Sequence, residues 1–173
     1  MNVRGFTLIE LLAVMLVVAV LTAVALPRMV NVGQSAQVAS LQGMHAALNS
    51  ATTMVSSFAA LEGLTNQNAI LPDGTRIRLN NGYPNARWGA SVRRLVSLDN
   101  VPQSGARAEC ERDWCGRGNR NSIPGLDPAL IGSSGHAALI YSRGYTFRDQ
   151  CGVYYINPRD GSAPLTGLLT DGC

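Results

Sequence analysis

The chain begins with an apolar segment that contains a single carboxylate. Residues Phe6–Leu26 are almost entirely hydrophobic, and Glu10 lies near their start. The segment is as long as the roughly 20 residues that an α-helix needs to span a lipid bilayer. An unpaired charge inside such a segment costs at least about 2.5 kcal/mol, so we expect Glu10 to have a specific partner.

The length of the apolar segment is compatible with a simple membrane anchor, and its composition is compatible with a secretory signal peptide. Arg4 supplies a positive start, and Ala23–Ala25 fits the small-x-small pattern of a cleavage site. Two observations weigh against the signal peptide. Glu10 interrupts what would be its apolar region, and the apolar periodicity continues past Ala25 as if into a longer helix.

A third interpretation accounts for Glu10. The segment Arg4–Glu10 (RGFTLIE) resembles the prepilin motif of type IV pilins and the related pseudopilins. The resemblance implies cleavage after Gly5, N-methylation of the new N-terminal residue Phe6, and retention of the apolar segment. It also implies that Glu10, the fifth mature residue, pairs with the N-terminal amine of a neighbouring subunit during assembly. Such a pair offsets much of the cost of burying each charge.

The helix is expected to extend well beyond the apolar segment. Pro27 lies where many pilins carry a helix-bending proline, and with Gly33 it predicts a bend. Apolar residues then recur at helical spacing up to about Leu61, where Glu62-Gly63 gives a stop signal. These positions are Val38, Leu41, Leu48, Val55 and Ala59. His45 falls on or near the same face, and we interpret it as a hydrogen-bonded core histidine rather than a ligand.

The remainder of the chain alternates short β patterns with turns. Arg87–Leu98 is expected to form a short helix with Trp88, Val92, Leu95 and Val96 on one side. Residues 102–135, rich in Gly, Pro, Ser and Arg, are expected to form a long solvated loop, with an anion-binding site at its arginines as the alternative. Antiparallel strands packed on a long helix give an α+β domain. The expected strands are Thr75–Leu79, Ala137–Tyr141, Gly152–Ile156 and an edge strand within Pro164–Leu169.

Four cysteines, all in the second half of the chain, favour disulfides behind an export-type N-terminus. Of the three possible pairings we favour Cys151–Cys173, which closes a C-terminal loop, together with Cys110–Cys115. A four-cysteine zinc site is the alternative, although the spacing fits a zinc ribbon poorly. Trp114, between two of the cysteines, is a candidate exposed aromatic contact for a sugar or a partner.

A finer resemblance is patchy. Segments of the helix and head are similar to mannose-sensitive haemagglutinin pilins, whereas the Cys110–Cys115 loop departs from their pattern. The similar segments are Pro27-Arg28, Leu41–Gly43, Ala46–Ala51, Asn81–Pro84 and Cys151–Tyr155.

The resemblance implies the type IV pilin fold, with a leader at 1–5, a transmembrane and filament-core helix at 6–33, and a globular head at 34–173. It implies a structural subunit of a type IV pilus that serves adhesion, surface attachment or motility. The precursor would sit in the inner membrane of a Gram-negative bacterium before it joins an extracellular filament. The implied partners are other pilin subunits, a prepilin peptidase and N-methyltransferase, and an inner-membrane assembly platform, with no cofactor.

Three alternatives to a major pilus subunit are considered. A type II secretion pseudopilin or a minor pilin would share the N-terminal mechanism. A secreted enzyme is disfavoured because the chain has only two histidines, His45 and His136, and no nucleophile, phosphate-binding or metal motif. The net charge of +3 is too small to argue for a nucleic-acid partner.

Overall fold

The computed structural model describes residues 7–173, except for the side chains of residues 24–32. The chain divides into two compact units, Met1–Gln37 and Val38–Cys173. One helix, α1 (Leu8–Leu61), contributes to both units, and its end confirms the predicted stop near Leu61. The backbone is helical through Pro27 and Gly33. The bend expected there remains a prediction, because the side chain of Pro27 lies outside the described residues.

Within the second unit, one face of α1 is buried as its periodicity predicts. Leu41, Leu48, Val55 and Ala59 are each at most 1% exposed. Val38, at the start of this unit, is only half-buried. The apolar spacing therefore located the face of α1 that packs on the rest of the second unit.

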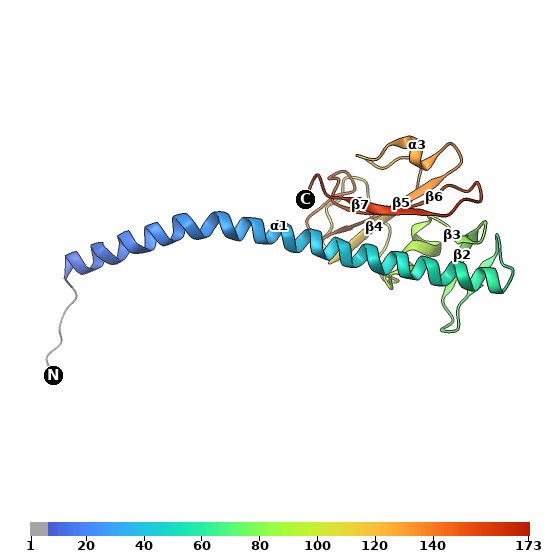
Figure 1. The fold of residues 1–173 in the computed structure, drawn as a ribbon, viewed down its shortest axis with the longest axis horizontal. Helices are drawn as coiled ribbons and strands as arrows, with labels where there is room; N and C mark the ends of the chain where they lie inside the picture. Colours follow the sequence, from blue (N-terminus) through green and yellow to red (C-terminus); the bar gives the residue numbers. More distant parts are fainter. Residues whose placement is uncertain (1–6) are drawn as a thin grey trace. The chain divides into compact units, whose positions relative to one another are not determined.

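Two antiparallel sheets follow α1 (Figure 1). The three-stranded sheet has the order β1 (Asn68–Ile70), β2 (Arg76–Asn80), β3 (Tyr83–Pro84). The four-stranded sheet has the order β4 (Trp114–Arg120), β5 (His136–Ser142), β6 (Gly152–Asn157), β7 (Leu165–Leu169). Short helical segments lie between them: η1 (Trp88–Val92), α2 (Arg93–Leu95) and α3 (Pro128–Ile131). The α+β prediction is confirmed, as are the four predicted strands within one or two residues at their ends.

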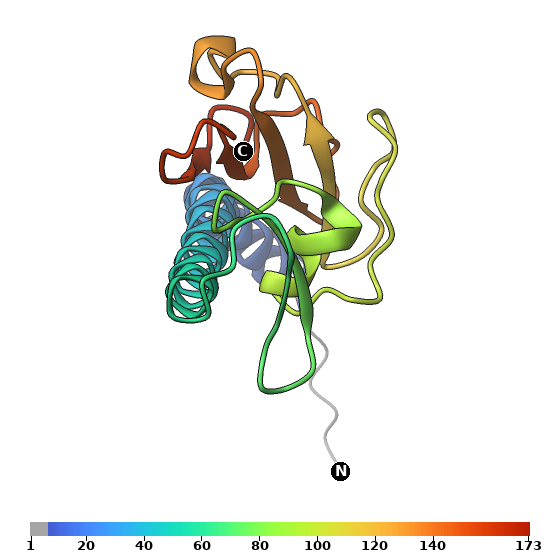
Figure 2. The same ribbon diagram turned by 90° about the vertical axis from the view of Figure 1, so that its right-hand side faces the viewer.

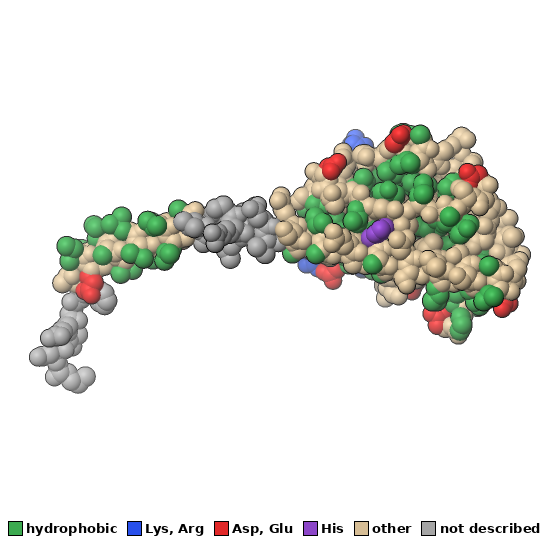
Figure 3. All heavy atoms as spheres, viewed as in Figure 1, with side chains coloured by type: hydrophobic (Ala, Val, Ile, Leu, Met, Phe, Trp, Pro, Cys, Tyr) green, Lys and Arg blue, Asp and Glu red, His purple; other side chains and the backbone are tan. Residues whose placement is uncertain are grey.

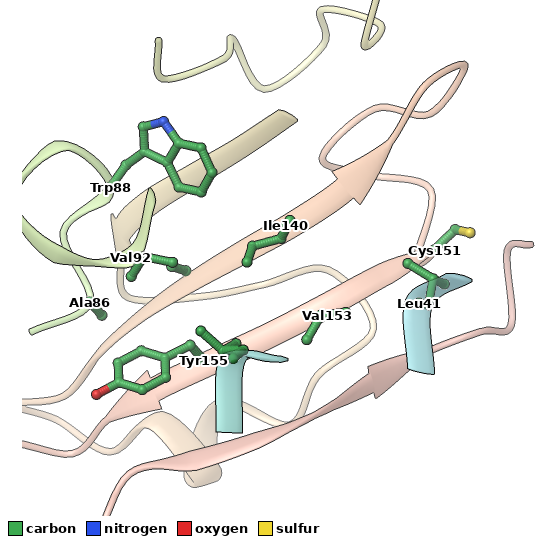
Figure 4. Close-up of a cluster of buried hydrophobic side chains, with 10 residues drawn as sticks. Leu41, Ala86, Trp88, Val92, Ile140, Cys151, Val153 and Tyr155 are labelled. Atoms are coloured by element: carbon green, nitrogen blue, oxygen red, sulfur yellow. The ribbon is translucent and has the colours of Figure 1, made fainter. Parts of the chain in front are cut away.

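Strand β5 is buried on both faces, which explains its uninterrupted apolar sequence. On one face Ala138 and Ile140 join a cluster with Leu41 and Leu48 of α1 (Figure 4). On the other face Ala137, Leu139 and Tyr141 join a second cluster, in which Ile131 of α3 takes part. The four-stranded sheet therefore lies between two layers of the head.

The expectation of a solvated loop over residues 102–135 is wrong. This segment supplies the edge strand β4 and helix α3, and it covers the second face of the sheet with the buried side chains of Ile123 and Ile131. Strand β4 escapes sequence patterns because it contains Gly116 and Gly118 instead of β-branched residues.

Those two glycines are required by Trp88. A Cβ atom at position 116 would lie 2.0 Å from Cζ3 of the Trp88 ring, and one at position 118 would lie 2.4 Å from the Trp88 backbone nitrogen. Trp88 itself is 1% exposed, and its indole N–H donates to the carbonyl oxygen of Val101 at 2.9 Å. The helical segment is shorter than the predicted Arg87–Leu98. Of the four residues predicted to share one side, Trp88 and Val92 are buried, and Leu95 and Val96 are half-buried.

Both favoured disulfides are present. Cys151 is bonded to Cys173, and Cys110 to Cys115, so all four sulfur atoms are used. Trp114 is not the exposed aromatic that the sequence suggested. It begins β4 opposite Ser142, and its half-buried side chain packs against the cluster that contains Leu41.

Candidate assembly site

The first turn of α1 carries the predicted assembly residue. The helix starts when the backbone N–H groups of Glu10 and Leu11 donate to the carbonyl oxygen of Thr7 at 3.1 and 3.2 Å. Glu10 is exposed in this first turn, where a carboxylate is favoured by the helix dipole. The predicted cleavage and methylation residues, Gly5 and Phe6, lie outside the described residues.

The following turns expose large apolar side chains on every side of the helix. Figure 3 shows hydrophobic side chains along the first described turns of α1. A helix that is apolar all round is normally covered by protein or lipid. The exposed fractions of these side chains run from 50% to 87%, and the residues are Leu8, Ile9, Leu11, Leu12, Val14, Met15, Leu16, Val17, Val18, Val20 and Leu21.

Only two side chains between Leu8 and Ala23 are polar, and the helix satisfies one of them. The hydroxyl of Thr22 donates to the backbone carbonyl of Val18 at 2.9 Å or of Ala19 at 3.0 Å. This local bond lets a threonine enter apolar surroundings without an unsatisfied donor. Within the described residues the carboxylate of Glu10 has no side-chain partner. Glu10 is therefore the single polar group of this stretch that needs a partner from elsewhere.

In the part of the chain that the structure describes, we find no helix with both the length and the apolar character to cross a membrane. The predicted span Phe6–Leu26 reaches into residues outside that part, at Phe6 and at positions 24–26. Over the described residues there is also no group of three or more His, Cys, Asp or Glu side chains placed to hold a metal ion.

His45 has the structural role that the sequence predicted. Its ring Nε2 lies 3.0 Å from the hydroxyl of Thr166 in β7, so the half-buried ring is hydrogen-bonded within the fold. The fold also brings together a second group of polar residues, which no sequence pattern predicts. They lie at the ends of β2 and β6 and include Arg78, Asn80, Asn157 and Arg159.

Comparison with known proteins identifies a family motif in the N-terminal segment. Residues 1–26 match the family model described as the prokaryotic N-terminal methylation motif. With the long helix, antiparallel sheets and disulfides, the motif defines a prepilin-like protein of the type IV pilin class, which is structural and not enzymatic.

The chain belongs to the family of the ComG operon protein 3 homolog of Bacillus licheniformis. It is 31% identical to that protein over 99 residues, which cover 50% of this chain and 99% of the relative. No solved structure matches the chain. Neither the motif nor this relative supports the mannose-sensitive haemagglutinin subgroup.

Proposed function

We propose that the chain is a structural subunit of a type IV pilus-like filament. A prepilin peptidase cuts the leader after Gly5, Phe6 is N-methylated, and the apolar segment Phe6–Leu26 holds the precursor in the membrane before assembly. The observation that carries this proposal is the methylation motif at residues 1–26, continuous with a helix whose apolar side chains are exposed.

The apolar side chains of α1 supply the driving force. Burying one large aliphatic side chain gains about 1.5–3 kcal/mol. Eleven such residues between Leu8 and Leu21 are at least half exposed in the isolated chain. Packing the helices of neighbouring copies side by side covers these residues in the filament, as lipid covers them in the precursor.

Glu10 then sets the position of one subunit against the next. An unpaired carboxylate among packed apolar helices is costly, and the new amine at Phe6 of a neighbouring copy is a charge of opposite sign. Pairing the two favours the axial offset that brings them together and disfavours all others. Since Thr22 is satisfied inside its own helix, Glu10 is the residue of this stretch that discriminates between offsets.

Mass spectrometry of the mature protein tests the processing step. The expected N-terminus is Phe6 with one added methyl group. A mature chain that begins near Leu26 would instead show an ordinary signal peptide, and the filament proposal would fail.

Glu10→Gln tests the pairing step, because it removes the charge and keeps the shape of the side chain. Cleavage after Gly5 should continue, while the yield of sheared filaments should fall by about tenfold or more. Glu62→Gln is the matched control, since Glu62 is also an exposed glutamate near an end of α1. Equal filament yields from the two variants would refute the pairing.

A type II secretion pseudopilin and a minor pilin are the second candidates, and adhesion, surface attachment and motility are further proposals for the filament. The proportion of this chain in purified surface filaments separates the candidates. A major subunit makes up most of the filament protein, and a minor pilin is present only in trace amounts. A pseudopilin is absent from surface filaments. The relative comes from Bacillus licheniformis, a Gram-positive bacterium. The expectation of a Gram-negative cell envelope is therefore not supported.

A further inference from the structure

The second unit contains a polar cavity of about 140 Å³ where the three-stranded sheet meets the end of β6. Its walls come from β2, the segment after β3, the end of β4, the start of β5 and the turn after β6. An engineered cavity of about 150 Å³ accommodates a benzene ring, so this volume suits a single six-membered ring.

The cavity is strongly cationic. Arg78, Arg87 and Arg159 line it, and no aspartate or glutamate does. The two ion pairs of the described residues involve other arginines, so these three guanidinium groups have no carboxylate partner there. A guanidinium presents a planar fork of donors that fits carboxylate and phosphate oxygens. The walls are therefore suited to an anion.

Hydrogen bonds between the walls hold the cavity in shape. The amide Nδ2 of Asn157, which is 2% exposed, donates to the carbonyl oxygen of Pro84 at 2.9 Å. Its Oδ1 accepts from the backbone N–H of Arg159 at 2.9 Å. Asn81 Nδ2 donates to the carbonyl oxygen of Arg159 at 3.0 Å, which ties the turn after β6 to the three-stranded sheet. A cavity built in this way loses little entropy when a ligand enters.

The lining also offers groups for hydroxyls. Asn80 lines the cavity and is half-buried, and its side-chain amide group can hydrogen-bond to a ligand hydroxyl. Arg159 Nη1 lies 3.1 Å from Nδ1 of His136. Nδ1 also lies 3.3 Å from the carbonyl oxygen of Ser134, whereas Nε2 makes no hydrogen bond within the described residues and can bond to a ligand hydroxyl.

We propose that this cavity binds one unit of an anionic sugar, a hydroxyl-bearing six-membered ring that carries a carboxylate or a phosphate. The arginines take the anionic group, and Asn80 and His136 take ring hydroxyls. The cavity lies wholly within the second unit, so the proposal does not depend on filament assembly.

Isothermal titration calorimetry on the full-length protein, in a polyoxyethylene detergent that contains no sugar, tests the proposal. Glucuronate and glucose 6-phosphate are the probes, and whichever binds identifies the anionic group. Glucose, acetate and inorganic phosphate are the controls, and each should bind at least about tenfold more weakly than the better probe. The absence of binding by both probes, or equal binding by acetate or inorganic phosphate, would overturn the proposal.

Three variants locate the binding. Arg87→Gln and Arg159→Gln should each weaken the better probe by about tenfold, because each loses a charge-assisted hydrogen bond. Asn80→Asp, which is nearly the same shape, should also weaken it by placing a carboxylate in the cavity. Arg148→Gln is the control, since Arg148 is exposed and does not line the cavity. Unchanged affinity in all three cavity variants, with thermal unfolding like that of the control, would show that the probe binds elsewhere.

Discussion

His45 in α1 and Thr166 in β7 are joined by a hydrogen bond of 3.0 Å between Nε2 and Oγ1. The same hydroxyl donates its one proton to Oδ1 of Asn49 at 2.7 Å, so it accepts from the ring and His45 carries its proton on Nε2. His45 and Asn49 are one helical turn apart, and together they hold the edge strand β7 against α1 (Figure 2).

Thr166→Val removes both hydrogen bonds and keeps the branched shape. Because His45 is only half-buried and Asn49 is exposed, water replaces part of the loss, and we expect the free energy of unfolding to fall by about 1 kcal/mol. Urea unfolding of the full-length protein in detergent measures this change. The control is Thr53→Val, whose hydroxyl bonds only to the Asn49 carbonyl of its own helix and should change stability by less than about 0.5 kcal/mol. Equal effects of the two variants would contradict a role in joining helix and sheet.

Gly116→Ala and Gly118→Ala should each destabilise the fold because the added methyl group meets Trp88. The nearest atoms to the new Cβ would be 2.0 and 2.4 Å away, and a backbone nitrogen cannot move aside as a flexible side chain does. Overpacking of this kind costs about 1–3 kcal/mol. The measurement is the urea midpoint, together with the fluorescence of Trp88, whose surroundings should change.

Gly43→Ala is the matched control for these two variants. Gly43 is an exposed position within α1, and a Cβ there would have no atom within 4 Å. The change should therefore raise helix stability by about 0.5–1 kcal/mol. If all three alanine variants behaved alike, close packing of β4 on Trp88 would not be the reason for the two strand glycines.

The sequence located those parts of the fold that depend on local patterns. The face of α1 with Leu41, Leu48 and Val55 follows from helical spacing, and β5 and β6 follow from continuous apolar runs. The motif around Glu10 is likewise a local signal, because processing enzymes act on a short contiguous segment. These features need no knowledge of what lies beside them in space.

Strand β4 and the cationic cavity depend on distant contacts and were missed. Gly116 has low strand propensity, and β4 forms because it pairs with β5 and leaves room for Trp88. Arg78 and Arg87 are close in sequence, but Arg159 lies far along the chain from both, and only the meeting of the two sheets brings it to the same cavity.

The two disulfides should differ in how much they stabilise the fold. The Cys151–Cys173 bridge spans 22 residues, and the Cys110–Cys115 bridge spans 5. The chain-entropy model gives about 3 kcal/mol for the longer loop and about 2 kcal/mol for the shorter one. Replacing each pair by alanines and comparing urea unfolding measures both values. A larger loss from the Cys110–Cys115 pair would show that packing in the second cluster, and not loop closure, dominates there.

The buried phenol of Tyr155 should make the free energy of unfolding fall at alkaline pH. Burial raises the pKa of its phenol well above the ordinary value of 10.0, and its O–H donates to the carbonyl oxygen of Pro84. The folded state therefore keeps the proton at a pH where the unfolded chain loses it. The stabilisation is complete below about pH 10 and is lost as the pH rises above it, by about 1.4 kcal/mol per pH unit once the unfolded phenol is ionised.

Tyr155→Phe removes this titration together with the hydrogen bond. At pH 8 the variant should be less stable than the wild type by about 1 kcal/mol, because a net hydrogen bond is lost. The difference should shrink above pH 10 and vanish near pH 11, where ionisation of the unfolded wild-type chain has cost it a similar amount. Urea unfolding at pH 8, 9, 10 and 11 with intact disulfides measures the two curves. Curves that stay parallel over this range would show that the Tyr155 phenol ionises as readily in the folded state as in the unfolded chain.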